Sequence, residues 1–352
     1  MSYLINKDDK WKAVSHLQKC IRRGRSDLVE DIARQLWALD NAYLRHRLNV
    51  IFSEDLGIAN PELANELQQD KLNKRWVDAQ GGIDYLVSKL KDMCNSVKDR
   101  TACEFGSIAN YKVFEHETGI IWEDLTVEEA IDYAWNELLS VEARAAAVFK
   151  AVGTDIFEHS HLPEGVKGDW DKWIDSQRAH GVPENIVTMM QNGKRTQREW
   201  HPAFLGLCWE NKQKHPEVIV EKTPVSQGMC GPYVSEAIDG HTMEGKKALS
   251  LLWSKHPLLK DSWLGMGYQQ DYETTMIALK KIVFLFEGGV TNKSLDYPLA
   301  REISTAQKNR WKNLVGIDPQ KAAQTVWNAM PFLHNTRNSL IHATLQADTP
   351  SP

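Results

Sequence analysis

Apolar residues recur at helical spacing along most of the chain, and this periodicity constrains the fold more than any other feature of the sequence. The first clear stripe lies on one face of a helix and consists of Val29, Ile32, Ala33, Leu36 and Trp37. A second stripe covers residues 44–52, after a break at residues 40–41. The two stripes predict a helical hairpin near the N-terminus.

Helix start and stop signals continue along the sequence. Three pairs combine a capping residue with a first-turn residue that suits it: Asn60 with Pro61, Thr126 with Glu129, and Asp318 with Pro319. The second pair precedes a long apolar stripe, and Gly153 is placed to end that long helical segment as a C-terminal cap. The only strand pattern is EVIVEKT, residues 217–223, which lies between two prolines. We therefore predict an all-α protein with few or no strands.

Changes in pattern along the chain predict its domain organisation. The 352 residues are enough for two or three domains. Thirteen tryptophans, spread from Trp11 to Trp327, favour several cores or one large helical core over a single ligand site. The expected units are a helical domain at 1–110, a long helix with a loop-rich connector at 111–220, a helical domain at 221–345 and a disordered tail at 346–352.

Charge and cysteine content exclude several classes of function. The net charge of −5 argues against a wholly basic surface, so any contact with nucleic acid requires a local patch. The candidate patch is IRRGR with the preceding lysine, which comprises Lys19, Arg22, Arg23 and Arg25. Five cysteines without a C-x-x-C pair favour a reducing cytoplasm over disulfides or a zinc knuckle.

We expect no membrane span, no signal peptide and no cofactor. No segment approaches the ~18 consecutive apolar residues of a membrane helix, and the N-terminal residues MSYLINKDDK lack the apolar core of a signal peptide. His159 and His161 have no third ligand at a suitable spacing, so a polar loop explains them better than a metal site does.

The stretch from His16 to Leu63 resembles a known helical module. Its most specific part is SEDLGIANPE, residues 53–62, supported by Gln18, Lys19, Ile21, Arg22, Tyr43, Leu44, Arg47 and Leu48. These residues resemble the C-terminal helical region of the replication-associated recombination protein A family, the RarA or MgsA type of AAA+ ATPases. A weaker likeness extends to about residue 105. The resemblance implies a collar-like module that self-associates and acts at replication forks, near single-stranded DNA ends, here without an ATPase domain of its own.

The resemblance also directs attention to a set of charged residues. Glu54 and Asp55 lie near a helix C-terminus, where the helix dipole disfavours carboxylates unless a cation compensates. Arg22, Arg45 and Arg47 are the expected partners, either within the same chain or across an interface. The alternative is a solvent-exposed acidic turn, since exposed ion pairs contribute little to stability.

Two stretches partly resemble ATPase motifs, but neither has the sequence context that such a motif requires. GHTMEGKK, residues 240–247, matches the phosphate-binding loop pattern except for the last hydroxyl. The residues before it do not read as a buried strand, so we interpret the stretch as a helix start with Thr242 as N-cap and Glu244 in the first turn. Gly245 is unfavourable there unless another backbone approaches closely. KIVFLFEGG, residues 281–289, reads as part of a buried helix.

An alternative enzymatic hypothesis rests on RNSLIHA, residues 337–343. It resembles the R-N-x-x-x-H motif of the HEPN superfamily, all-helical domains that include metal-independent ribonucleases. The resemblance implies that His342 is the acid or base and that Arg337 stabilises the phosphate, with Asn338 on the same helix face as His342.

Together these observations favour a non-enzymatic accessory protein of DNA replication, recombination or repair. Its expected partners are copies of itself, replication or repair proteins and single-stranded DNA, without a membrane. The HEPN-type ribonuclease is the alternative.

Overall fold

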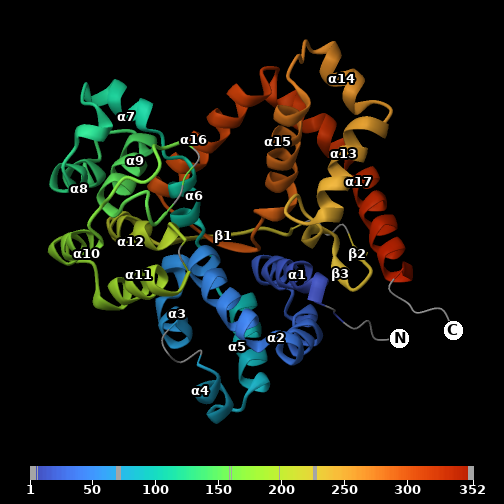
Figure 1. Ribbon diagram of the computed structural model, residues 1–352, viewed down its shortest axis with the longest axis horizontal. Coiled ribbons are helices and arrows are strands. Elements are labelled where there is room, and N and C mark those ends of the chain that lie inside the picture. The colour runs from blue at the N-terminus through green and yellow to red at the C-terminus, as the bar shows by residue number, and fades with distance from the viewer. Residues whose placement is uncertain are drawn as a thin grey trace.

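Helices form most of the described chain, as the apolar periodicity predicts. The computed structural model describes residues 5, 7–68, 73–157, 159, 161–197, 199–224 and 228–347. Within them, buried apolar side chains gather into three clusters. Figure 1 shows the corresponding regions as blue helices at the bottom, green helices at the left and orange to red helices at the right. The prediction of an all-α fold is confirmed, since the strands of the described residues are few and short.

The N-terminal region contains the stretch for which the sequence predicts a collar-like module. Its main elements are α1 Lys10–Arg23, α2 Glu30–Ile51, a π-helical turn Phe52–Leu56, a 3₁₀ turn Gly57–Ala59, α3 Pro61–Gln68, α4 Lys74–Ala79 and α5 Ile83–Asn95. The predicted break falls at Asp40, where φ is −160° and ψ is 82°. The hairpin prediction needs correction here, because the two stripes belong to one kinked element and are not separated by a loop. Asn60 accepts a hydrogen bond from the N–H of Leu63 (3.1 Å) and starts α3 as expected.

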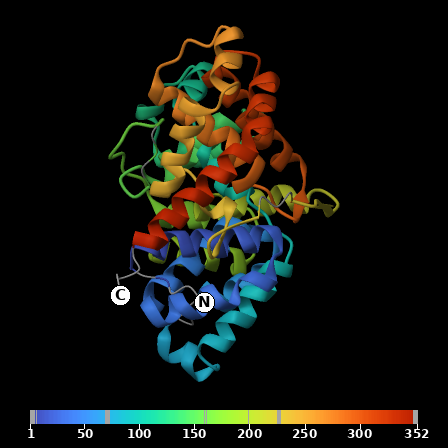
Figure 2. The ribbon, with the colours of Figure 1, turned by 90° about the vertical axis from the view of Figure 1, so that its right-hand side faces the viewer.

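Distant parts of the chain complete the N-terminal core. Tyr233 and Val234, which form the short strand β3, pack into this core, as does Ile341 of α17 Pro319–Ala347. Figure 2 shows the red C-terminal end of α17 reaching the blue N-terminal helices. The three regions are therefore not simple consecutive segments of sequence.

The second region has the largest core. It contains α6 Thr101–Ser107, α7 Tyr111–Thr118, α8 Val127–Trp135, α9 Val141–Val152, α10 Trp170–Ala179, α11 Glu184–Gln197 and α12 Leu205–Gln213. Thr126 and Glu129 form the predicted capping box of α8. The long helix expected after it is in fact two helices, because α8 ends at Trp135 and Ser140 caps a new helix, α9, that Gly153 closes with φ 95°.

The third region is built from the C-terminal third of the chain. It contains α13 Met243–Lys255, α14 Leu259–Gly265, α15 Tyr272–Val283, a π-helical turn Phe284–Gly288 and much of α17. Asp318 caps α17 by accepting hydrogen bonds from the N–H groups of Gln320 and Lys321 (3.0 and 3.2 Å). One helix, α16 Pro298–Val315, joins the regions: its residues Leu299 and Ile303 lie in the second core, and Val315 lies in the third.

Two small antiparallel sheets complete the described structure. The predicted strand exists as β1 Val218–Glu221 and pairs with β4 Lys293–Asp296, with Ile219 opposite Leu295. The second sheet pairs β2 Met229–Cys230 with β3 Tyr233–Val234. Lys98, after α5, adds a bridge to Ser294. The sheet of β1 and β4 thus lies where the three regions meet (Figure 1).

No helix of the described residues combines the length and the apolar character needed to cross a membrane. The five cysteines are all free, and four of them are buried.

Candidate functional site: a cationic cleft between two regions

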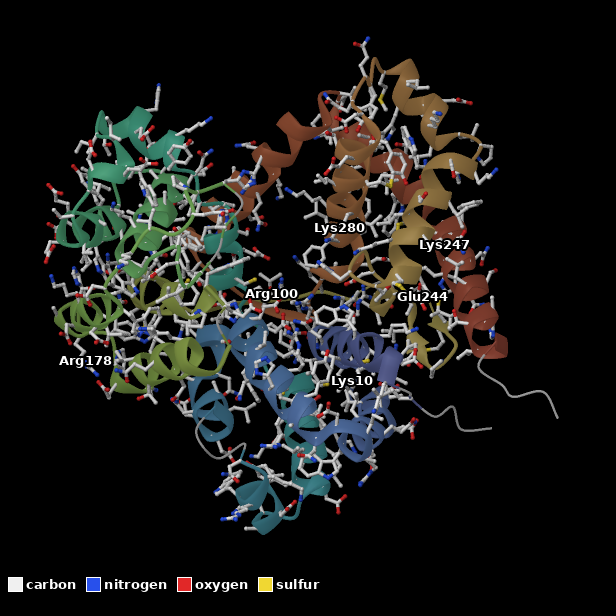
Figure 3. The ribbon with its side chains drawn as sticks, viewed as in Figure 1. Lys10, Arg100, Arg178, Glu244, Lys247 and Lys280 are labelled. Carbon is white, nitrogen blue, oxygen red and sulfur yellow. The ribbon has the colours of Figure 1, made fainter. Side chains whose placement is uncertain are left out.

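A cleft of about 1170 Å³ separates the second and third regions. One wall comes from α6, α16 and the segment that carries His159 and His161, and the opposite wall comes from α15. The floor contains the strands β1 and β4 and a group of buried charged side chains. Figure 3 shows Arg100 where the three regions meet and Lys280 on α15. A cleft of this volume is large enough to hold a ligand.

The helix α16 presents a polar face to the cleft that has no carboxylate. Arg301, Ser304, Thr305 and Lys308 line the cleft at the spacing of one helix face. The only acid of α16, Glu302, is not among the residues that line the cleft. Hydroxyl and cationic groups therefore dominate this wall, and both types donate hydrogen bonds to anions.

Several cations of the cleft lack a carboxylate partner within 4 Å among the described residues. They are Lys222, Lys280, Lys281, Lys308 and Arg310. Arg310 is held in place because its Nη1 donates to the carbonyl of Ser107, at the end of α6. Burial lowers the pKa of Lys281, and repulsion by Arg310 and Lys280 lowers it further. Burial also lowers the pKa of Arg310, and the charge of Glu142 partly offsets this effect.

The two histidines singled out in the sequence lie beside these cations. His159 is buried, packs its ring against Phe149 and Trp200, and accepts a hydrogen bond from the N–H of His161 (3.3 Å). Burial, with repulsion by Arg310 and His161, lowers the pKa of His159 to about 4. Burial lowers the pKa of His161, and repulsion from Arg310 and Lys281 lowers it further. In the described part of the chain, no three His, Cys, Asp or Glu side chains gather in a group that could hold a metal ion.

Trp200 gives the cleft an aromatic surface with a fixed orientation. Its Nε1 donates to the carbonyl of Cys103 (3.4 Å). Its ring lies so close to Gly106 that a Cβ there would be 2.2 Å from the Trp200 Cδ1. Glycine at position 106 therefore allows the indole to pack against α6 and holds it at the edge of the cleft.

The carboxylates that line the cleft are almost all neutralised by nearby cations. Asp99 is buried and accepts hydrogen bonds from the N–H of Thr101 and the hydroxyl of Tyr297, and burial raises its pKa. The other acids each have a cation within 4 Å: Glu54 with Arg22, Glu104 with Arg100, Glu236 with Arg23, Asp239 with Lys19, Glu287 with Arg337 and Asp296 with Arg301. The charge that remains uncompensated in the cleft is therefore positive.

The floor contains the ion pairs suggested by the SEDLG stretch. Arg22 forms ion pairs with Glu54 (2.7 Å) and Asp55 (2.6 Å), and its Nη1 donates to the carbonyl of Gly288 (2.5 Å). Arg100 contacts both carboxylates as well. Sequence reasoning missed Arg100, although the charged run of residues 98–100 was a signal for a buried polar turn. All of these contacts lie within one chain.

The other two arginines proposed as partners of this acidic pair lie elsewhere. Arg45 donates hydrogen bonds to the carbonyl and side chain of Asn41. The guanidinium of Arg47 lies 5.0 Å from the centre of the Trp11 ring. Neither residue reaches Glu54 or Asp55 through any ion pair of the described structure.

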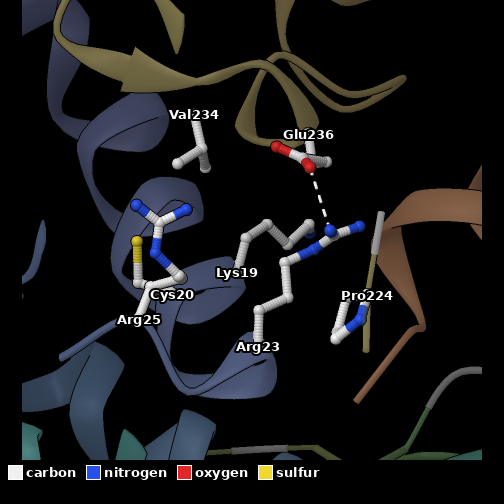
Figure 4. A pocket seen from close by; sticks show the side chains of 7 residues that line it. All are labelled: Lys19, Cys20, Arg23, Arg25, Pro224, Val234 and Glu236. Atoms are coloured by element: carbon white, nitrogen blue, oxygen red, sulfur yellow. Dashed lines mark ion pairs between the residues drawn. The ribbon is translucent and has the colours of Figure 1, made fainter. Parts of the chain in front are cut away.

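The basic residues proposed as a nucleic-acid patch are mostly buried, which corrects that expectation. Lys19 pairs with Asp239 (3.0 Å), Arg22 with the acidic pair, and Arg23 with Glu236 (2.9 Å). Arg25 is the exception, with a partly exposed side chain that pairs with Asp27. Figure 4 shows Lys19, Arg23 and Arg25 around a cavity of about 40 Å³, which they share with Cys20, Pro224, Val234 and Glu236. The four residues do not form one exposed basic surface.

The residues of the ribonuclease hypothesis lie on α17 in different environments. Arg337 is fully buried and pairs with Glu287 (2.8 Å), the acid of KIVFLFEGG. His342 is exposed, and Asn338 is half-buried. Arg337 and His342 are therefore not brought together within one chain, because the ion pair with Glu287 holds the arginine in the interior.

GHTMEGKK begins α13, as interpreted from the sequence. Thr242 caps the helix by accepting a hydrogen bond from the N–H of Gly245 (2.9 Å), and Glu244 pairs with Lys12 (2.8 Å). A Cβ at position 245 would lie 1.8 Å from the carbonyl oxygen of Asp239. The backbone approach expected at Gly245 is thus present, and its source is the turn just before the helix.

The fold and the cleft define an all-helical protein with a positively charged cleft. No family model, curated protein or solved structure matches this chain. The cationic residues of the cleft escaped sequence reasoning, although the acid-free stretch at 303–315 was a signal for one of its walls.

Proposed function

We propose that this protein is a non-enzymatic accessory protein of DNA replication, recombination or repair, and that its cleft binds a single strand of nucleic acid. The observation that carries the proposal is the set of cations on α15 and α16 that face the cleft without carboxylate partners. The resemblance of residues 16–63 to a replication-associated collar supplies the DNA context.

The chemistry of the walls suits a phosphate backbone. Lysine and arginine side chains that neutralise phosphates supply most of the sequence-independent affinity for nucleic acid. Ser304 adds a hydroxyl donor between Arg301 and Lys308 on α16, whereas the Thr305 hydroxyl donates to the carbonyl of Arg301 (2.9 Å). The buried carboxylates of the floor do not oppose an anion strongly, since neighbouring arginines and lysines compensate them.

The cleft suits a single strand better than a duplex. A single strand can turn its bases outward and stack them on aromatic side chains, whereas a duplex keeps its bases inside. Trp200 offers such a surface, and its fixed orientation reduces the entropy lost on binding.

A direct test measures the fluorescence anisotropy of a dye-labelled oligothymidylate, its duplex and an RNA of the same sequence over a series of salt concentrations. We expect tighter binding of the single strands and a steep loss of affinity with salt. Lys308→Glu should weaken binding at least tenfold, while Lys260→Glu, an exposed lysine of α14 outside the cleft, should leave it unchanged. No measurable binding, or equal losses in both variants, would reject the proposal.

We also propose that the N-terminal region mediates self-association. Arg22, Glu54 and Asp55 are occupied within the chain, so the interface has to use other residues, such as the half-exposed Trp11 on α1. Light scattering over micromolar concentrations tests this part, and a monomer at every concentration would contradict it.

A further inference from the structure

Three basic side chains from separate elements line the cleft and act on one another electrostatically. Lys281 comes from α15, Arg310 from α16, and His161 from the segment between α9 and α10. We propose that these three residues form a binding site for one phosphate group. The inference rests on the proposed function for its ligand, a nucleic-acid strand, and it specifies the point at which that strand is anchored.

The proposal begins from the geometry of the cavity. All three residues line the same cleft, and none of them forms an ion pair with a carboxylate of the described residues. Glu142, in the first turn of α9, acts on Arg310 electrostatically without forming an ion pair. An anion between the three side chains would therefore supply the negative charge that the protein does not place there.

The arginine is already oriented for such a ligand. One Nη of Arg310 is held by the Ser107 carbonyl, and Gln307, one turn earlier on α16, donates to the hydroxyl of Ser107 (3.2 Å). No other hydrogen-bond partner of the Arg310 guanidinium is found among the described residues, so its remaining N–H groups can donate to an oxyanion. A planar guanidinium held in this way matches the geometry of phosphate oxygens.

The electrostatic environment agrees with this reading. Burial lowers the pKa of His161, and the charges of Arg310 and Lys281 lower it further. Burial also lowers the pKa of Lys281, and the charges of Arg310 and Lys280 add to that effect. The groups therefore repel one another in the free protein. Bound phosphate would relieve that repulsion, and groups with perturbed pKa values in a cleft are typical of functional sites.

The test uses two probes on the full chain. Inorganic phosphate is titrated by calorimetry, and an oligothymidylate of about eight nucleotides is titrated by fluorescence anisotropy in a salt series. Lys281→Gln and Arg310→Gln are compared with Lys260→Gln, and circular dichroism checks that each variant folds. Lys281 forms no hydrogen bond in the described structure, so Lys281→Gln provides a readout even if Arg310→Gln unfolds.

We expect Lys281→Gln to weaken the binding of both probes and to reduce the slope of log affinity against log salt by about 1. Lys260→Gln should change neither quantity. If the oligonucleotide binds and responds to Lys308→Glu but not to Lys281→Gln or Arg310→Gln, the phosphate site is wrong and the proposed function stands. If phosphate binds in a Lys281-dependent way while no oligonucleotide binds, the site stands and the proposed function is wrong. Binding of neither probe rejects both.

Discussion

Arg337 on α17 and Glu287 in the π-helical turn after α15 form an ion pair of 2.8 Å whose side chains are 1% and 3% exposed. The backbone carbonyl of Glu287 also accepts a hydrogen bond from Arg23 of α1 (2.9 Å). Two stretches that suggest separate catalytic hypotheses from sequence, RNSLIHA and KIVFLFEGG, therefore meet in one structural contact. The hydrogen bond from Arg23 to Glu287 ties this pair, and with it the third region, to the N-terminal region.

Loss of Arg337 should destabilise the protein strongly. Arg337→Met leaves the carboxylate of Glu287 buried without its partner, and breaking a buried pair in this way costs about 3–5 kcal/mol. Urea denaturation followed by circular dichroism measures the change in the free energy of unfolding.

A double variant separates the pair from its surroundings. Because Arg337→Met with Glu287→Met removes both buried charges, its loss of stability should be smaller than the sum of the two single losses. Additive losses would mean that the two side chains do not act as a pair. His342→Ala, at an exposed position of the same helix, should change stability by no more than ~0.5 kcal/mol.

Arginine at position 22 should not be replaceable by lysine. The guanidinium of Arg22 contacts two carboxylates and the carbonyl of Gly288 at once, which a single ammonium group cannot reproduce. We expect Arg22→Lys to lower the free energy of unfolding by about 2 kcal/mol or more. Arg25→Lys is the matched control. Among the described residues Arg25 forms an ion pair with Asp27 alone, at the surface, so this variant should change stability by less than ~0.5 kcal/mol. Equal effects at the two positions would contradict the buried network.

Local features of the fold could be predicted well from sequence because short-range chemistry determines them. Four helices are capped by the residue expected from sequence, because a capping side-chain oxygen accepts a hydrogen bond from an N–H group only two or three residues away. These caps are Asn60, Thr126, Thr242 and Asp318. The strand β1 was recognised from its apolar run, whereas β4, with the sequence KSLD, has too few apolar residues to signal a strand.

The candidate site could not be predicted because its residues come together only through tertiary packing. Lys281, Arg310 and His161 are separated by long stretches of sequence, and no local pattern joins them. For the same reason, the basic residues at 19–25 suggested a binding patch, although Lys19 and Arg23 are buried against Asp239 and Glu236, more than 200 residues away. Arg22 is buried against Glu54 and Asp55. The acid-free polar face of α16 was the only local signal for the cleft.

Alanine at position 245 should destabilise the protein although alanine favours helices. Its Cβ would lie 1.8 Å from the carbonyl oxygen of Asp239, so the start of α13 has to move. We expect a loss of about 2 kcal/mol or more, measured by thermal unfolding. Gly265→Ala, in α14 with nothing within 4 Å of the added Cβ, should be neutral or stabilising by up to ~1 kcal/mol. A neutral Gly245→Ala would show that the close approach is absent.

Stability should fall as the pH drops from about 6.5 to 4, partly through His201. The side chain of His201 is buried with its Nε2 2.8 Å from the Ser53 hydroxyl, and burial lowers its pKa to about 4. The unfolded chain binds a proton at His201 near pH 6.5, whereas the folded chain binds it only at about pH 4. The stability that the neutral His201 contributes is therefore complete above pH 6.5 and is lost as the pH falls below this value.

The size of this effect can be isolated by substitution. The pKa shift of His201 corresponds to a loss on the order of 3 kcal/mol, and His159, whose pKa is also lowered to about 4, adds to it. His201→Gln should flatten the dependence of the unfolding free energy on pH between 6.5 and 4, whatever its effect at neutral pH. An unchanged slope in this variant would show that His201 is not held neutral by the fold.

Binding of a single strand should strengthen as the pH falls, through His161. In the free protein, burial and the charges of Arg310 and Lys281 lower the pKa of His161, so its imidazole is neutral at neutral pH. A bound phosphate favours the protonated imidazole and raises this pKa, and by linkage protonation increases the affinity for phosphate. Anisotropy titrations with oligothymidylate, whose bases do not titrate in this range, measure the affinity at each pH. His161→Gln should remove most of the pH dependence, His342→Gln should retain it, and an identical pH dependence in the two variants would place the titrating group outside the phosphate site.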